Sequence, residues 1–201
     1  SYQPVEYTIE SDWSAAATIM VAAAIAGEVT IKNISTLSRQ ADTAICRALE
    51  RAGASIIIEE NKITVAHRKL EAFEFDATQC PDLFPALVAL AAAAEGVSVI
   101  SGIGRLRGKE SDRGEVLSAE YSKLGIDIEL DYDADQMRVV GGPVTAAEVD
   151  SHDDHRIAMS LAITALRTDE KITIRNQECV AKSYPSFFDD LESLRSGYCD
   201  K

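Results

Sequence analysis

The sequence has few of the residues that mark disulfide-rich, metal-binding or membrane proteins. Its four cysteines (Cys46, Cys80, Cys179 and Cys199) form no Cys-x-x-Cys pair and no metal-ligand spacing. We therefore expect reduced thiols and a cytoplasmic protein. The hydrophobic runs are rich in alanine and shorter than a bilayer-spanning helix, so no membrane segment is predicted. No secretory leader is expected either.

Positive charge is also scarce. The 201 residues include 20 Lys and Arg against 33 Asp and Glu, which gives a formal net charge of −13. Such a protein repels nucleic acids and anionic membranes, so neither is expected as a partner. Against this background Arg105, Arg107, Lys109 and Arg113 stand close together. A local basic cluster in an acidic protein favours a small anion as the ligand.

The chain contains an internal repeat of roughly 70 residues, marked by Asp12, Asp82 and Asp154. Each unit predicts a strand, an Ala-rich helix that is apolar on all sides, a second strand and an amphipathic helix. Two further strands close the first two units and are missing from the third. The units span about residues 5–67, 71–142 and 147–195.

A helix that is apolar on all sides must be buried on all sides. We therefore expect the Ala-rich helices, over residues 14–26, 83–94 and 157–166, to pack at the centre of one α/β domain. This domain would have three βαβαββ units and pseudo-threefold symmetry. Chance similarity between ordinary βα units is the alternative, and the agreement of several landmarks disfavours it. The incomplete third unit predicts an exposed sheet edge.

Polar side chains gather where the predicted helices begin, and the repeat would bring them to a single rim. Free backbone N–H groups and the positive end of the helix dipole suit such a rim to anions. The residues concerned are Asp12, Asp82 and Asp154 before the first helix of each unit, and Gln40, Glu110 and Lys182 near the second.

Each of these residues also has a purely structural interpretation. Aspartates cap helices, and for Asp12 we prefer capping. For Asp82 capping and function remain equally open. Lys109 and Arg113 are four residues apart, so both would face one side of a helix over residues 111–124. That side is either a solvated charged face or, because like charges repel, a clamp for an anion.

His155 and Arg156 at the start of the third Ala-rich helix form an unusual pair, because cations oppose the helix dipole there. A bound anion would resolve the conflict. A salt bridge to Asp153 or Asp154 would resolve it equally well. His152 has no partner in the sequence, and no function is predicted for it.

Three motifs resemble those of the 5-enolpyruvylshikimate-3-phosphate synthases. They are Arg-Gly-Lys-Glu-Ser-Asp-Arg at 107–113, Asp-His-Arg-Ile-Ala-Met at 154–159 and Lys-Ser-Tyr-Pro at 182–185, with Asp82 as a further match. The resemblance covers nearly the whole chain. It implies two domains of three βαβαββ units each, with the active site between them. Residues 1–201 would form the C-terminal domain, and an N-terminal stretch outside this sequence would supply the two missing strands.

The resemblance also implies a reaction and its participants. The enolpyruvyl group of phosphoenolpyruvate would pass to the 5-hydroxyl of shikimate 3-phosphate, with release of phosphate, in aromatic amino acid biosynthesis. The implied partners are these two anionic substrates, with no metal or organic cofactor. Arg113, Arg156 and Lys182 would bind phosphoenolpyruvate. Because half of the site would be missing, we expect the chain to be inactive alone.

The remaining implied roles concern shikimate 3-phosphate and proton transfer. Asp82 would bond the substrate hydroxyls and act as the base. Glu110 would exchange a proton with the methylene carbon, and Lys109 would contact shikimate 3-phosphate and assist proton transfer. His155 would support its neighbours. Arg105 stands where some members carry an asparagine that contacts this substrate.

Two other functions remain open. An enolpyruvyl transferase acting on UDP-N-acetylglucosamine shares the fold, but its usual motifs lack the combination of Lys-Glu-Ser-Asp-Arg and Asp-His-Arg, so we rank it lower. A non-catalytic anion-binding scaffold domain is the third interpretation.

Overall fold

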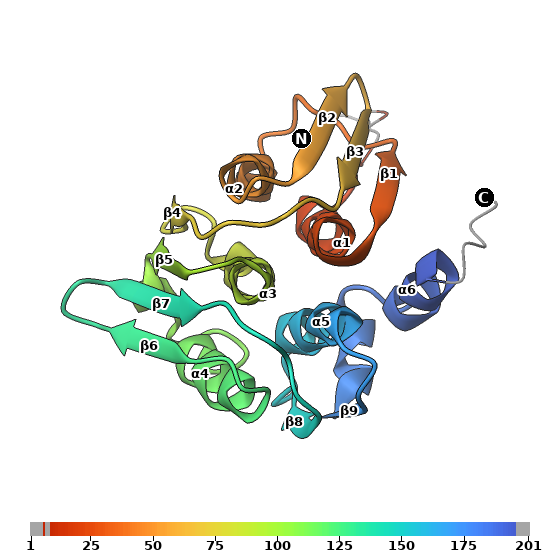
Figure 1. Cartoon of the computed structure of the whole chain (residues 1–201). Coiled ribbons are helices and arrows are strands. Elements are labelled where there is room, and N and C mark those ends of the chain that lie inside the picture. Colours follow the sequence, from red (N-terminus) through yellow and green to blue (C-terminus); the bar gives the residue numbers. More distant parts are fainter. Residues whose placement is uncertain (1–5, 7–8, 196–201) are drawn as a thin grey trace, which may run out of the picture.

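Three helices form the centre of the fold. The computed structural model describes residue 6 and residues 9–195. In it α1 (Trp13–Ala26), α3 (Phe84–Ala93) and α5 (His155–Thr164) contact one another (Figure 1). Every residue of α3 except the last is buried, and alanine is its commonest residue. Helices that are apolar on all sides are stable only in such a position. The predicted helical centre is therefore confirmed.

Three small sheets surround these helices. The first is antiparallel with the order β1–β3–β2, the second has the order β4–β5–β7–β6, and the third is the parallel pair β8–β9. The strands are β1 Glu28–Lys32, β2 Ser55–Glu59, β3 Lys62–Ala66, β4 Glu74–Asp76, β5 Val97–Ser101, β6 Ile128–Asp131, β7 Gln136–Val140, β8 Ala147–Asp150 and β9 Ile172–Arg175.

The remaining helices lie outside the centre (Figure 1). The second unit has the predicted order β4, α3, β5, α4, β6, β7, and the third has β8, α5, β9, α6. The mixed α/β fold is therefore confirmed. These helices are α2 Ile45–Arg51, α4 Arg113–Lys123 and α6 Phe187–Arg195, and the short 3₁₀ helices are η1 Ala41–Ala44, η2 Pro81–Leu83, η3 Ile103–Leu106, η4 Ala165–Arg167 and η5 Gln177–Lys182.

Two predicted elements differ in the structure. The strand predicted at the start of the first unit lies partly outside the described residues, and Glu6, Ile9 and Glu10 belong to no strand. The helix predicted from residue 111 begins only at Arg113, because the preceding segment is irregular and Gly108 has a φ of 75°. The residues between Gly108 and Arg113 therefore form a loop that leads into α4.

A buried polar network ties the outer helix α4 to the central helices. The hydroxyl oxygen of Tyr121 lies 2.6 Å from Ser160 Oγ and 2.8 Å from Thr164 Oγ1, both on α5. Ser160 Oγ donates in turn to the Pro85 carbonyl of α3 at 2.5 Å. Burial raises the pKa of Tyr121 to about 12, so it remains a neutral hydrogen-bonding group. These bonds fix α4 relative to α3 and α5.

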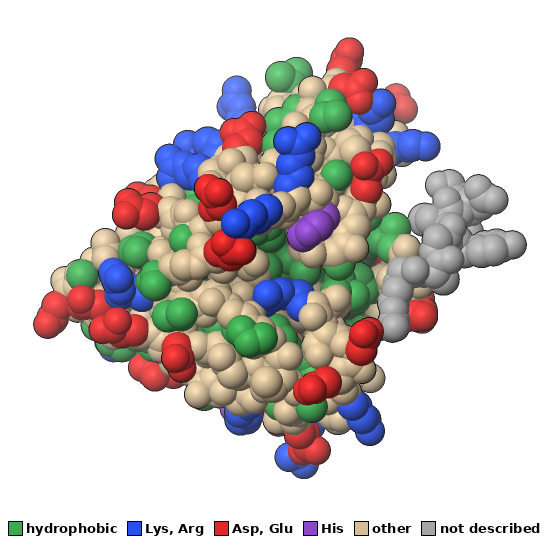
Figure 2. Space-filling view, in the orientation of Figure 1, with side chains coloured by type: hydrophobic (Ala, Val, Ile, Leu, Met, Phe, Trp, Pro, Cys, Tyr) green, Lys and Arg blue, Asp and Glu red, His purple; other side chains and the backbone are tan. Residues whose placement is uncertain are grey.

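The surface charges and the cysteines of the described residues agree with what the composition suggests. Figure 2 shows a face with acidic and basic side chains interspersed with hydrophobic ones. No helix within residues 6 and 9–195 is long and apolar enough to cross a membrane. Cys46, Cys80 and Cys179 are unpaired and buried, and burial raises the pKa of Cys46 and Cys80 to about 11. Cys199 lies outside the described residues.

Candidate functional site

Arg113 is the centre of a charged cluster at the N-terminal ends of α3, α4 and α5. Its side chain is fully buried. Nη1 donates to Asp82 Oδ1 at 2.7 Å, Nη2 to Glu110 Oε2 at 2.6 Å, and Nε to Asp154 Oδ2 at 2.7 Å. Burial lowers the pKa of Arg113, but these carboxylates raise it by more than burial lowers it. The net pKa is above the ordinary value, so the guanidinium stays charged. Its planar fork of donors thus joins three chain segments.

Asp154 links the cluster to α5. Its side chain is fully buried, and besides Arg113 it accepts from Ser111 Oγ at 3.1 Å and from the Arg156 amide at 3.0 Å. The bond from the Arg156 amide makes Asp154 the N-cap of α5. Asp12 caps α1 in the same way, by accepting from Ser14 N. Burial raises the pKa of Asp154, but the bonds from Arg113 lower it more, so the net pKa is below its ordinary value.

Asp82 lies in η2, directly before α3, and makes no capping bond. Lys109 Nζ lies 3.2 Å from Oδ1, and Arg156 Nη2 lies 3.5 Å from Oδ2. Burial raises the pKa of Asp82, but Arg156, Arg113 and Lys109 together lower it below its ordinary value. The structure therefore gives Asp82 a role in binding cations rather than in capping. Its side chain is 36% exposed and remains accessible to solvent.

The structure overturns the expectation that Lys109 and Arg113 share one helix face. Lys109 lies in the loop before α4, and Arg113 is the first residue of the helix. Both side chains donate to the same oxygen, Asp82 Oδ1. Their mutual repulsion is therefore offset by an internal carboxylate. Glu110, in the same loop, is 42% exposed and also reaches Arg113.

The expectation of two cations at the start of α5 is wrong for His155. Its side chain is buried, and Nδ1 has no hydrogen-bond partner in the described part of the chain. Burial and the nearby Arg156 lower the pKa of His155, so the imidazole is neutral at pH 7. The guanidinium of Arg156 pairs with Asp82, whereas the alternative to a bound anion had been a salt bridge to Asp153 or Asp154.

Two predicted residues lie further out. Lys182, at the end of η5, is exposed, and its Nζ donates to the Asp153 carbonyl at 2.6 Å. It is thus attached to the segment that carries Asp154 and Arg156. Arg105 is exposed in η3, and no hydrogen bond or ion pair joins it to the cluster within the described residues. The rim therefore includes Lys182 at its edge and excludes Arg105.

The first unit contributes a residue that the sequence analysis did not assign to the site. Asp42 in η1 is buried and accepts a hydrogen bond from Ser14 Oγ. Burial raises its pKa above the ordinary value, and the charges of Arg156 and Asp82 also act on it. Asp42 matches Asp112 at the repeat spacing, but Asp112 is not one of the residues that form the cluster, so this spacing gave no signal for the site.

The cluster is suited to anions rather than metal ions. No group of three or more His, Cys, Asp or Glu residues within the described chain is arranged to hold a metal. The carboxylates of Asp82, Glu110 and Asp154 converge instead on a guanidinium. The partly exposed cations Lys109 and Arg156 can bind an anion. The partly exposed carboxylates of Asp82 and Glu110 can exchange protons with it.

A protein-family model described as EPSP synthase (3-phosphoshikimate 1-carboxyvinyltransferase) matches residues 2–191. The chain belongs to the EPSP synthase family. Relatives named 3-phosphoshikimate 1-carboxyvinyltransferase are 40% identical over 197 residues in Clostridium perfringens and 41% over 196 residues in Methanocella arvoryzae. Each alignment covers 96% of this chain and 46% of the relative. The chain thus spans about half the length of these members of the EPSP synthase family.

Solved structures agree with the family assignment. An EPSP synthase from Acinetobacter baumannii superposes with a TM-score of 0.81 at 33% identity, over 93% of this chain and 46% of that one. An enolpyruvyl transferase from Streptomyces tendae superposes with a TM-score of 0.72 at 22% identity, over 96% of this chain and 45% of that one, which shows a shared fold. The fold is therefore that of the EPSP synthase family.

Proposed function

We propose that this chain supplies half of the active site for transfer of the enolpyruvyl group of phosphoenolpyruvate to the 5-hydroxyl of shikimate 3-phosphate. The observation that carries the proposal is the cluster in which Lys109, Arg113 and Arg156 converge on Asp82. The family match favours this acceptor over UDP-N-acetylglucosamine. A scaffold role would not require Asp82 and Glu110 to be partly exposed beside the cations.

In this proposal the cations bind phosphoenolpyruvate. Arg156 is partly exposed beside Asp82, and Lys182 is exposed at the edge of the rim. Both can reach the carboxylate and phosphate of a ligand through charge-assisted hydrogen bonds. Arg113 is committed to three carboxylates, so it would gain a ligand oxygen by exchanging the exposed Glu110 for it. Lys109 would contact shikimate 3-phosphate.

The two partly exposed carboxylates take the proton-transfer roles. Asp82, kept ionised by its cations, accepts hydrogen bonds from the substrate hydroxyls and takes the proton of the attacking 5-hydroxyl oxygen. That oxygen forms a bond to C2 of phosphoenolpyruvate while Glu110 gives a proton to C3. Glu110 then takes a proton back from C3, the C2–C3 double bond re-forms and the C–O bond to phosphate breaks, and the proton held by Asp82 leaves with the phosphate. His155 is neutral, and it packs beside Arg156 to support it.

We also propose that the chain is one domain of a two-domain protein. In the other sheets β1 and β5 each pair with an antiparallel neighbour, whereas β9 pairs only with β8 within the described residues. A hollow of about 580 Å³ beside β9 is lined by Ile172, Ile174, Phe188 and Leu191, among others. The lining also includes polar and charged residues, such as Glu170 and Lys171. An added antiparallel hairpin would pair with this edge and cover the hollow. The cysteines in the described part of the chain form no disulfide, which supports a cytoplasmic location for the protein.

Co-expression with the missing half tests the proposal. The complementary part of the Clostridium perfringens relative would be produced with this chain, and phosphate release from phosphoenolpyruvate and shikimate 3-phosphate would be measured. We expect turnover by the pair and none by the chain alone. Amides of β9 should also exchange more slowly in the pair, because the edge becomes hydrogen-bonded. Turnover by the chain alone would contradict the proposal.

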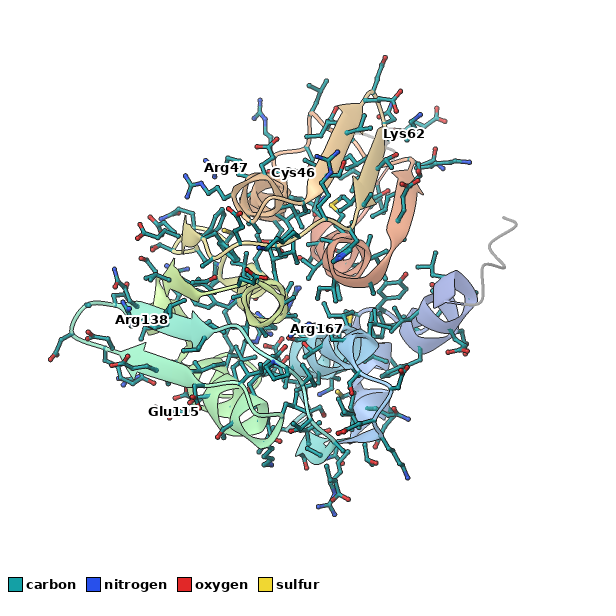
Figure 3. The ribbon with its side chains drawn as sticks, viewed as in Figure 1. Cys46, Arg47, Lys62, Glu115, Arg138 and Arg167 are labelled. Carbon is teal, nitrogen blue, oxygen red and sulfur yellow. The ribbon has the colours of Figure 1, made fainter. Side chains whose placement is uncertain are left out.

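Matched arginine variants separate the site from general charge effects. Arg156→Ala should lower the activity of the pair at least ~10²-fold, because it removes charge-assisted bonds of ~1.5–3 kcal/mol each. Arg138→Ala removes the same charge from β7, where Arg138 is exposed (Figure 3). It should leave activity within about twofold. Equal activities of the two variants would count against the assigned site.

A further inference from the structure

Glu120 is a buried carboxylate that the proposed reaction does not use. It lies on α4, and its side chain is 3% exposed. Lys123 Nζ donates to its two oxygens at 2.8 and 2.7 Å. Across the gap to the third unit, His152 Nε2 lies 2.9 Å from Oε1, and the Asp150 amide donates to Oε2 at 2.8 Å. The carboxylate therefore joins α4 to the segment between β8 and α5.

The same segment is attached to α4 at a second point. Arg113 and Glu120 are seven residues apart on α4, about two helical turns, so both project from one face. Arg113 holds Asp154 at one end of the segment, and Glu120 holds Asp150 and His152 at the other. Residues 150–154 therefore lie along α4 and are held at both ends.

The segment adopts a conformation that side chains other than glycine rarely take. His152 and Asp153 have φ values of 50° and 59°, in the left-handed region. Such a conformation persists only where the surroundings enforce it. The His152 amide donates to Asp150 Oδ1 at 2.7 Å, but within the described residues the side chain of His152 hydrogen-bonds only to Glu120. Glu120 is thus a principal support of the strained turn.

We propose that Glu120 is a positioning residue for the phosphoenolpyruvate site. Together with His152 it holds the turn that presents Arg156, and the same turn receives Lys182 at the Asp153 carbonyl. The inference rests on the proposed function, because Arg156 and Lys182 are its proposed ligand-binding cations. Burial raises the pKa of Glu120, but its bonds from Lys123, His152 and the Asp150 amide lower it below the ordinary value. The carboxylate is therefore ionised when it holds the turn.

Two substitutions and one control test the inference in the 201-residue chain. Glu120→Gln removes the charge with little change of shape. His152→Asn shortens the donor while keeping a residue that tolerates positive φ. The control, Glu115→Gln, removes a carboxylate from the same helix, where Glu115 accepts from the Tyr132 hydroxyl at 2.7 Å. Glu115 projects from the side of α4 away from α5 (Figure 3).

The first measurement needs no ligand. Amide hydrogen exchange of residues 151–156 should rise about tenfold in Glu120→Gln and in His152→Asn, and stay unchanged in Glu115→Gln. Amides of α3 report global unfolding and should not change. The variant that carries both Glu120→Gln and His152→Asn should exchange no faster than Glu120→Gln alone, because both substitutions weaken the same contact between the two side chains. Equal exchange in all variants, or a parallel rise in α3, would overturn the inference.

The second measurement is the affinity for phosphoenolpyruvate, followed by NMR titration. Glu120→Gln should bind about five- to tenfold more weakly than the unsubstituted chain, although Glu120 is too deep to touch the ligand. Unchanged affinity together with faster exchange of the turn would also overturn the inference. Absence of binding by the unsubstituted chain would count against the proposed function, and the exchange data would still decide whether Glu120 holds the turn.

Discussion

Replacing Arg113 by methionine tests whether charge holds the cluster together. Methionine keeps an unbranched side chain and removes the guanidinium, so Asp154 would stay buried with only Ser111 Oγ and the Arg156 amide as partners. Removing one partner of a buried ion pair costs about 3–5 kcal/mol, because a charge is left uncompensated. We expect the free energy of unfolding at pH 7 to fall by about this amount.

The pH dependence gives the prediction a sign. With Arg113 present, the folded pKa of Asp154 lies below its unfolded value of about 3.9. Its stabilising contribution is therefore present above that pH and is lost as the pH falls through the folded pKa. In the variant, burial, the largest single influence on this pKa, is opposed only by the bonds from Ser111 Oγ and the Arg156 amide, so we expect the folded pKa of Asp154 to rise above the unfolded value. Stability from Asp154 is then present at low pH and lost as the pH rises.

Urea denaturation followed by circular dichroism at about pH 4 and pH 7 measures both effects. The deficit of Arg113→Met should be larger at the higher pH. Arg138→Met is the control, because Arg138 is exposed and lies 3.7 Å from Glu129. It should change stability by less than about 0.5 kcal/mol. A deficit below about 1 kcal/mol for Arg113→Met, or one that is equal at both pH values, would refute the reasoning.

Two further substitutions probe the packing. Tyr121→Phe removes the buried hydroxyl that joins α4 to α5, and the free energy of unfolding in urea should fall by about 1–3 kcal/mol. The control Tyr132→Phe removes an exposed hydroxyl and should be nearly neutral. Equal effects of the two substitutions would contradict this prediction. A Cβ at Gly141 would lie 1.7 Å from the Ala94 carbonyl oxygen, so Gly141→Ala should lower the melting temperature by several degrees. Gly27→Ala, with nothing within 4 Å of the added carbon, is its control; a harmless Gly141→Ala would show that the backbone yields.

Much of the fold could be predicted because its signals are local. The two strands predicted to close the first unit are β2 and β3, and Asn61 between them has the positive φ that a tight turn uses. The helices α1 and α3 were recognisable because no side of them is strongly polar, whereas α5 carries Arg156, Ser160 and Thr164 along one side. Their meeting at the centre then followed from the need to bury every face.

The details of the site depend on distances between units, which the sequence does not contain. The repeat placed Asp82, Glu110 and Asp154 near one rim, and the structure brings these three carboxylates together around Arg113. The neutral state of His155 follows from its burial, which only the folded chain defines. Functional roles for these residues remain predictions.

The three Ala-rich helices impose a constraint that reaches beyond the interior. They fill the middle of the fold, and two of them, α3 and α5, begin directly after the segments that carry Asp82 and Asp154. A bulkier residue deep between them would push their axes apart and displace both segments at the same time. Substitutions far from any ligand could therefore alter recognition, and the narrow spacing of these helices helps to set the precision of the rim.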